Sequence, residues 1–150
     1  MRTTTRSGPH WTSDRGSAPI EAVFVLPVLL ALALLFIAGA RLSSAAGTTD
    51  AAAQAAARAA SLARTPDAGQ AAAVRAAERV LADQEQGCAG TAVEADTSGL
   101  AVPVGQASEV TVTVRCTVPL GDLFFLKGGP GTKTVESTFT SVVDAYRTRG

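Results

Sequence analysis

The stretch that decides the fold of this chain is RGSAPIEAVFVLPVLLALALLFIAGAR, from Arg15 to Arg41. No charged residue occurs between Ala22 and Ala40. A helix of that length is roughly 28 Å long at about 1.5 Å per residue, which is close to the hydrocarbon thickness of a bilayer. The sequence therefore predicts one transmembrane helix, with an acid, Glu21, at its start.

The composition limits the classes of function. The chain has 150 residues and a formal net charge of zero, with no clustered basic face, so nucleic acid is not expected as a partner. The one histidine, His10, precedes the apolar run. A domain beyond the membrane would therefore hold neither a Ser-His-Asp or Cys-His nucleophile nor a Cys2His2 metal site. We expect no enzyme activity, cofactor or metal.

The flanking charges predict the orientation in the membrane. The segment before the apolar run carries more arginines than acids, and this positive excess places the N-terminus in the cytoplasm. Arg41 at the far end weakens the signal. We expect a single-pass protein of the cell membrane whose C-terminal part is extracytoplasmic.

Three interpretations of the apolar run compete. Ala38-Gly39-Ala40 matches an A-x-A cleavage site of a secretory signal, but the run is longer than the usual apolar region of about 7–15 residues. An edge acid such as Glu21 is also unusual in that class. A plain signal anchor and a prepilin-type signal are the other two, and secretory cleavage ranks third.

The acid at the helix start fits a known signal. Gly16 precedes Ser17, and Glu21 is the fifth residue counted from Ser17. This resembles a type IV prepilin signal. Glutamate, five apolar residues, Pro27, an apolar run and the closing Gly39-Ala40-Arg41 resemble the TadE-like family of Tad/Flp (type IVc) pilus assembly pseudopilins.

The resemblance implies processing and assembly. A prepilin peptidase would cut between Gly16 and Ser17, and Glu21 would pair with a free amino terminus, in its own chain or in a neighbouring subunit. The implied partners are that peptidase, other pilin or pseudopilin subunits, the inner-membrane Tad machinery and membrane lipid. The alternative for Glu21 is an interfacial acid with no role. Pro27 favours a kink of use in assembly, or is a tolerated membrane proline.

The domain organisation follows from this segment. We expect a cytoplasmic leader at 1–16, a transmembrane helix at 17–41, a helical stalk at 42–64 and an extracytoplasmic α+β head at 65–150. Alanine, the best helix former, dominates 42–64, so the first helix should continue to Arg64 with a weak point at Gly47-Thr48-Thr49.

A second helix is predicted after Thr65-Pro66-Asp67, which supplies an N-cap, a proline at N1 and an acid in the first turn. It should run to about Gln86, with Gly87 at its C′ position. Its buried residues are predicted to be Val74, Ala77 and Leu81, and its solvated residues Arg75, Glu78, Arg79 and Asp83.

Three strands should follow. Glu109 to Val118 alternates strictly, with the valines and Cys116 on one face and threonines and Arg115 on the other. A weaker strand is predicted around Thr91 to Asp96, and a third from about Thr132 to Tyr146, with Val135, Phe139 and Val143 inward. The predicted fold class is α+β and pilin-like: a long N-terminal helix, a second helix and a small antiparallel sheet.

Cys88 and Cys116 both follow the apolar run and favour a disulfide, since such bonds persist outside the cytoplasm. The alternative is two unpaired core residues. The loop residues 123–126, Leu-Phe-Phe-Leu, are expected to pack on the core and less readily to form a partner patch.

Together these features predict a TadE-like minor pseudopilin that assists assembly of a Tad/Flp-type pilus or related secretion system after prepilin processing. The alternative is an unprocessed, single-pass, signal-anchored extracellular binding module.

Overall fold

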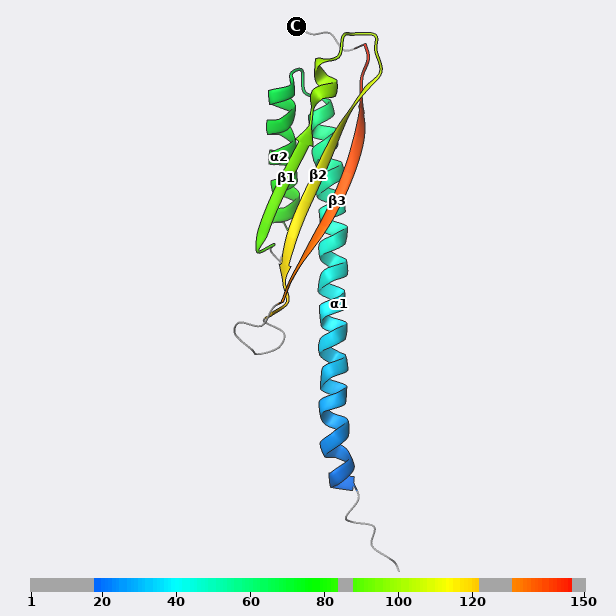
Figure 1. Cartoon of the computed structure of the whole chain (residues 1–150), viewed down its shortest axis with the longest axis vertical. Coiled ribbons are helices and arrows are strands. Elements are labelled where there is room, and N and C mark those ends of the chain that lie inside the picture. The colour runs from blue at the N-terminus through cyan, green and yellow to red at the C-terminus, as the bar shows by residue number, and fades with distance from the viewer. Residues whose placement is uncertain (1–17, 84–87, 122–130, 147–150) are drawn as a thin grey trace, which may run out of the picture. The chain divides into compact units, whose positions relative to one another are not determined.

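The computed structural model describes residues 18–83, 88–121 and 131–146. Its elements, drawn in Figure 1, are α1 (Ala18–Ser61), α2 (Pro66–Ala82), β1 (Gly90–Asp96), the 3-10 turn η1 (Ser98–Ala101), β2 (Ser108–Pro119) and β3 (Thr132–Val143). This order confirms the predicted α+β class. The chain divides into two compact units, Met1–Leu35 and Phe36–Gly150, which we call the N-terminal and C-terminal units.

α1 is continuous through Gly47, Thr48 and Thr49, where a weak point was predicted. The hydroxyl of Thr48 donates to the carbonyl of Ser44 (3.0 Å), and that of Thr49 donates to the carbonyl of Ala45 (2.7 Å). Both hydroxyls therefore find acceptors inside the helix without displacing its backbone bonds.

α1 ends at Ser61, earlier than the predicted Arg64. The Ser61 hydroxyl donates to the carbonyl of Arg58 (3.0 Å), and the N–H of Ala63 donates to the carbonyl of Ala60 (3.0 Å). These hydrogen bonds join residues three positions apart, so they tighten the last turn. They also satisfy carbonyl groups that have no partner within the helix.

α2 begins as predicted, because the Thr65 hydroxyl accepts a hydrogen bond from the N–H of Ala68 (3.3 Å). It ends at Ala82 with Asp83 as C-cap, short of the predicted Gln86, which lies with Gly87 outside the described residues. The predicted solvated residues are exposed. The buried residues of α2 lie four apart along the helix: Gly69, Ala73, Ala77 and Leu81. Ala77 and Leu81 were predicted to be buried, but Val74 is only half-buried.

The sheet has the order β1-β2-β3, with both pairs antiparallel. β2 is central, and its predicted inward residues Val110, Val112, Val114, Cys116 and Val118 are all buried. β3 pairs with β2 over its full length and ends at Val143. It stops before the predicted Tyr146 because the Asp144 carboxylate accepts the N–H of Tyr146 (2.9 Å) and closes a turn.

Both helices of the C-terminal unit cover one face of the sheet, and the core lies between these two layers. Alanines form the contribution of α1 to that core: Ala52, Ala53, Ala56, Ala57 and Ala60 are fully buried. The segment 42–64, which was predicted to be a stalk, thus contributes buried residues to one side of the core. Alanine permits the backbones of α1, α2 and β2 to approach closely, but it fills little volume.

Leu100 lies in η1, an element that the sequence did not predict, and at 1% exposure it is the most deeply buried leucine of this core. It packs on Gly69 of α2, where a Cβ atom would lie 2.5 Å from Leu100 Cδ1. A Cβ atom at Gly99 would likewise collide with the carbonyl group of Glu109. η1 therefore packs against both α2 and the start of β2.

Candidate functional site

The apolar stretch of α1 is the first candidate site. Among the described residues, one helix is long and apolar enough to cross a membrane, over Val23–Ser61. In the N-terminal unit its large apolar side chains are exposed: Phe24 is 71% exposed and Leu26 72%. Side chains of this kind favour lipid over water, so this helix could serve as a single-pass membrane anchor.

The predicted processing residues lie at the edge of the described chain. Gly16 and Ser17 fall outside the described residues. Glu21 lies in the first turns of α1, and its side chain is likewise outside the described part. Pro27 lies inside α1, which continues on both sides of it. The Val23 carbonyl lacks its usual helical donor there, because proline has no N–H.

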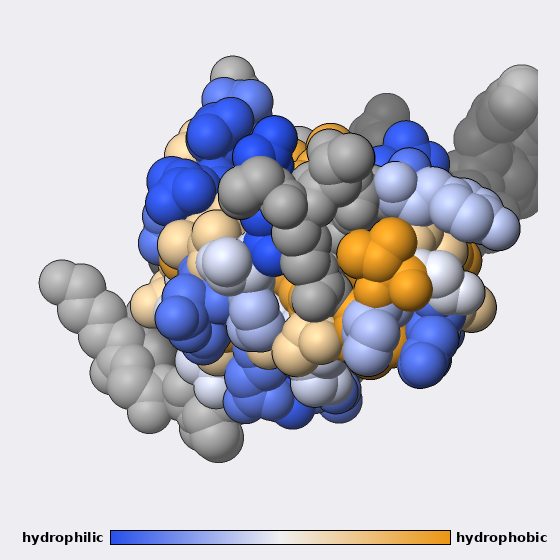
Figure 2. All heavy atoms as spheres, turned by 90° about the horizontal axis from the view of Figure 1, so that it is seen from above, coloured by the Kyte–Doolittle hydropathy of each residue, from blue (hydrophilic) through white to orange (hydrophobic). Residues whose placement is uncertain are grey.

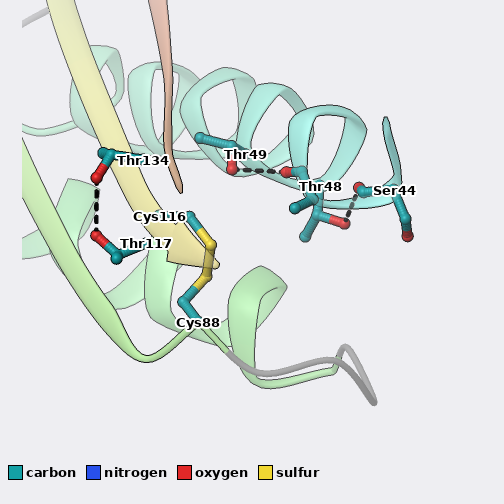
Figure 3. Close-up of a disulfide and its surroundings, with 8 residues drawn as sticks. Ser44, Thr48, Thr49, Cys88, Cys116, Thr117 and Thr134 are labelled. Atoms are coloured by element: carbon teal, nitrogen blue, oxygen red, sulfur yellow. Dashed lines mark hydrogen bonds between the residues drawn. A yellow bond between two sulfur atoms is a disulfide. The ribbon is translucent and has the colours of Figure 1, made fainter. Parts of the chain in front are cut away.

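A disulfide joins Cys88 and Cys116, the pairing that the sequence favoured (Figure 3). Their Cα atoms are 5.4 Å apart, and the bond closes a loop with a sequence separation of 28. Cys116 is 2% exposed and belongs to the inward-facing residues of β2, next to last before Val118. The bond therefore ties the segment that leads into β1 to the central strand.

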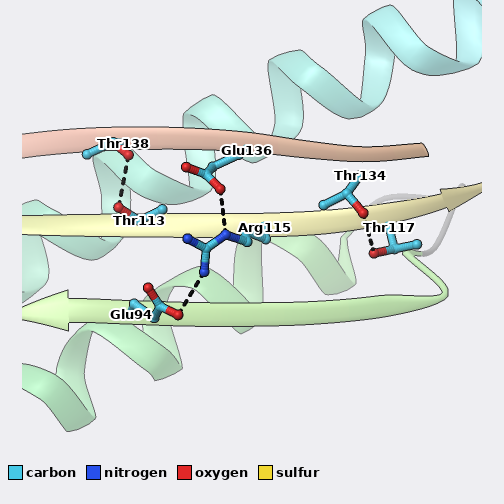
Figure 4. A network of polar contacts seen from close by, with 7 residues as sticks. All are labelled: Glu94, Thr113, Arg115, Thr117, Thr134, Glu136 and Thr138. Carbon is cyan, nitrogen blue, oxygen red and sulfur yellow. Dashed lines mark hydrogen bonds and ion pairs between the residues drawn. The ribbon is translucent and has the colours of Figure 1, made fainter.

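The outer face of the sheet, turned away from the helices, is hydroxyl-rich. Facing threonines of β2 and β3 are hydrogen-bonded across the strands, and two of these pairs appear in Figure 4. The pairs are Thr111–Thr140 (3.0 Å), Thr113–Thr138 (2.9 Å) and Thr117–Thr134 (3.1 Å). Such cross-strand pairs stabilise the register of the two strands.

Arg115 connects all three strands on this outer face (Figure 4). Its Nε donates to Glu136 Oε2 on β3 (2.5 Å), and its Nη1 donates to Glu94 Oε1 on β1 (2.7 Å). The hydrogen bond to Glu136 and then that to Glu94 raise the pKa of Arg115 above its usual value, so the guanidinium stays charged. The sequence placed Arg115 on the outer face but could not identify its partners.

Asp96 ends β1 and starts the turn into η1. The hydroxyl and the backbone N–H of Ser98 donate hydrogen bonds to its carboxylate and lower its pKa below the usual value; the N–H lies 3.0 Å from Oδ1. Within the described ranges, no three His, Cys, Asp or Glu side chains are grouped to hold a metal ion.

The end of the C-terminal unit where α1 ends exposes scattered apolar residues. Figure 2 looks onto this end and shows small apolar patches between hydrophilic side chains. The exposed large apolar residues in the described connections and at the end of β3 are Leu62, Val104, Val142 and Tyr146. The predicted apolar loop 123–126 lies outside the described residues.

One membrane-length N-terminal helix joined to a disulfide-bonded α+β unit defines the class of this chain as a candidate single-pass membrane protein with a small folded domain. Within that class, residues 16–58 match the family model described as TadE-like protein. The match confirms the resemblance read from Gly16, Glu21, Pro27 and Arg41, and is consistent with a TadE-like protein of Tad/Flp pilus systems. Comparisons with curated proteins and with solved structures find no match.

Proposed function

We propose that this chain is a minor pseudopilin of a Tad/Flp-type pilus or related secretion system, and that its role is in assembly and not in catalysis. The observation that carries the proposal is the family match over residues 16–58, the region that holds the glycine, the acid, the proline and the apolar helix. A prepilin peptidase cuts after Gly16, and the exposed apolar side chains of α1 contact lipid before assembly and other pilin helices after it.

In this proposal Glu21 neutralises a free amino terminus. After cleavage, Ser17 carries an α-amino group with a reference pKa of about 7.7–8.0, so it is largely cationic at neutral pH. An acid at a membrane boundary costs less free energy when a cation is beside it. The C-terminal unit then presents its surface to partners outside the cytoplasm, where its disulfide persists.

The test is the intact mass and N-terminal sequence of the protein extracted from its host's membranes. Prepilin processing leaves 150 − 16 = 134 residues beginning at Ser17. A chain that still begins at Met1 would leave the second candidate, an unprocessed anchored binding module.

The Glu21→Ala variant supplies an independent arm of the test. We expect normal membrane insertion but lost pilus assembly, whereas an anchored module would be unaffected. Glu21→Asp is the matched control, since it keeps the charge and should retain part of the assembly.

A further inference from the structure

The edge strand β3 presents an open row of backbone groups. It pairs with β2 over Thr132–Val143, and in an antiparallel ladder about half of the N–H and C=O groups of an edge strand point away from its neighbour. Among the described residues, no backbone hydrogen bond is made to the free edge of β3, the edge that points away from β2. The opposite edge strand, β1, is shorter, at seven residues.

The inner side of β3 is incompletely covered by α1. Ser137 donates to Asp50 Oδ1 (2.9 Å), and Ser141 donates to Ser61 Oγ (3.2 Å), so α1 does lie against this face. Yet Val135 and Phe139 are only half-buried, whereas their partners on β2, Cys116 and Val112, are buried. An added strand with apolar residues on this side would complete their burial.

The outer side of the sheet carries an unbalanced charge. Its acids are Glu94, Asp96, Glu109 and Glu136, and Arg115 is its cation. Glu136 stands on the edge strand itself, and its side chain remains 51% exposed despite the contact with Arg115. A residue placed directly opposite Glu136 on an added strand would be favoured as arginine or lysine.

From these observations we propose that β3 is a docking edge for an extended segment of another polypeptide, one that carries apolar residues on one face and a cation on the other. The segment adds a fourth strand to the sheet. A second copy of β3 does not meet this description, because its outer-face residues are Thr132, Thr134, Glu136, Thr138, Thr140 and Val142, with no cation. The placement of this partner in a pilus assembly rests on the proposed function.

The test uses the full chain in detergent and a synthetic peptide with the sequence of residues 108–119 carrying Cys116→Ser. This peptide is the probe because β2 already pairs with β3 and sets Arg115 opposite Glu136. We expect binding by fluorescence anisotropy, with slowed amide exchange in β3 and unchanged exchange in β1. A peptide in which Arg115→Glu replaces the cation should bind at least tenfold more weakly.

Two variants of the chain make the test specific. Val135→Lys places a charge on the inner side of the edge and should lower affinity at least tenfold, because inward charges block strand addition. Val142→Lys is the matched control, since it adds the same charge to the same strand at a position that is 75% exposed. It lies on the outer face, opposite Glu109 of the peptide in this register, so this variant should bind at least as tightly as the wild type. Glu136→Lys should reverse the preference and select the glutamate peptide.

Unchanged amide exchange in β3, or equal binding by the two lysine variants, would overturn the docking edge. Self-association of the chain through β3 would replace the proposed partner by a second copy. The peptide test does not depend on pili. If Glu21→Ala assembles pili normally while the peptide still binds β3, the proposed function fails and the docking edge stands.

Discussion

Leu100 gives the sharpest test of how the C-terminal unit is held together. It is 1% exposed and belongs to a buried cluster that consists mostly of alanine and valine. Leu100→Ala removes about 2 kcal/mol of transfer free energy and leaves a cavity, within the usual range of about 2–5 kcal/mol for such changes. Since the short alanine and valine side chains that make up most of this cluster can fill little of the space, we expect a loss of about 3–4 kcal/mol.

The measurement is urea unfolding of the full chain in detergent, followed by circular dichroism. Leu62→Ala is the matched control, because this leucine is 83% exposed, and its substitution should change the free energy of unfolding by less than about 0.5 kcal/mol. Equal effects of the two leucine substitutions would refute the account of the core.

A double-mutant cycle with Gly69 tests the contact itself. Gly69→Ala alone should destabilise by about 1–3 kcal/mol, since the new Cβ would lie 2.5 Å from Leu100 Cδ1. Once Leu100→Ala has removed that atom, the same change should be close to neutral. The gain of about 1 kcal/mol in helix propensity then offsets the tight approach that remains, 3.2 Å from the new Cβ to Thr97 Cγ2. Strict additivity of the two substitutions would show that they are not in contact.

Three further predictions concern other parts of the C-terminal unit. Replacing Cys88 and Cys116 by serine should lower the free energy of unfolding by about 3.5 kcal/mol in the chain-entropy model, and dithiothreitol should then have no further effect on urea unfolding. Thr65→Ala should cost about 1 kcal/mol in the same assay, because α2 loses its N-cap acceptor, whereas Thr48→Ala in the middle of α1 should be nearly neutral. Because the folded-state pKa of Asp96 is lowered, its contribution is present above its usual pKa of 3.8 and is lost as pH falls through the folded value. Asp96→Asn should therefore reduce the acid dependence of stability below that pH, and an unchanged pH profile would contradict this assignment.

The strictly patterned elements could be predicted from the sequence, and the tertiary contacts could not. The alternation in β2 identified every inward residue, and Thr65-Pro66 located the start of α2, because both signals depend on near neighbours. η1 was missed because Leu100 packs on Gly69 of α2, a residue far from it in the sequence, and no local pattern indicates that contact. The alanine face of α1 was seen as helix-forming, but nothing local shows that a sheet lies against it.

The polar network was only half predictable for a related reason. Alternation places Arg115 on the outer face, but its pairing with Glu94 and Glu136 depends on the register of three strands. That register is fixed by inward side chains and by the loops between strands. At the N-terminal end, the spacing of Gly16, Glu21 and Pro27 carried the family resemblance without any structure, because the signal is linear.

The five buried alanines of α1 affect how the stability of the C-terminal unit changes with temperature. Alanine has no side-chain torsion to freeze, so burying five of them costs no rotamer entropy. They also remove little apolar area from water, and apolar area sets most of the heat-capacity change of unfolding. The C-terminal unit should therefore have a small heat-capacity increment for its length and a flat stability curve. Its folded population would then change little between a cold and a warm habitat.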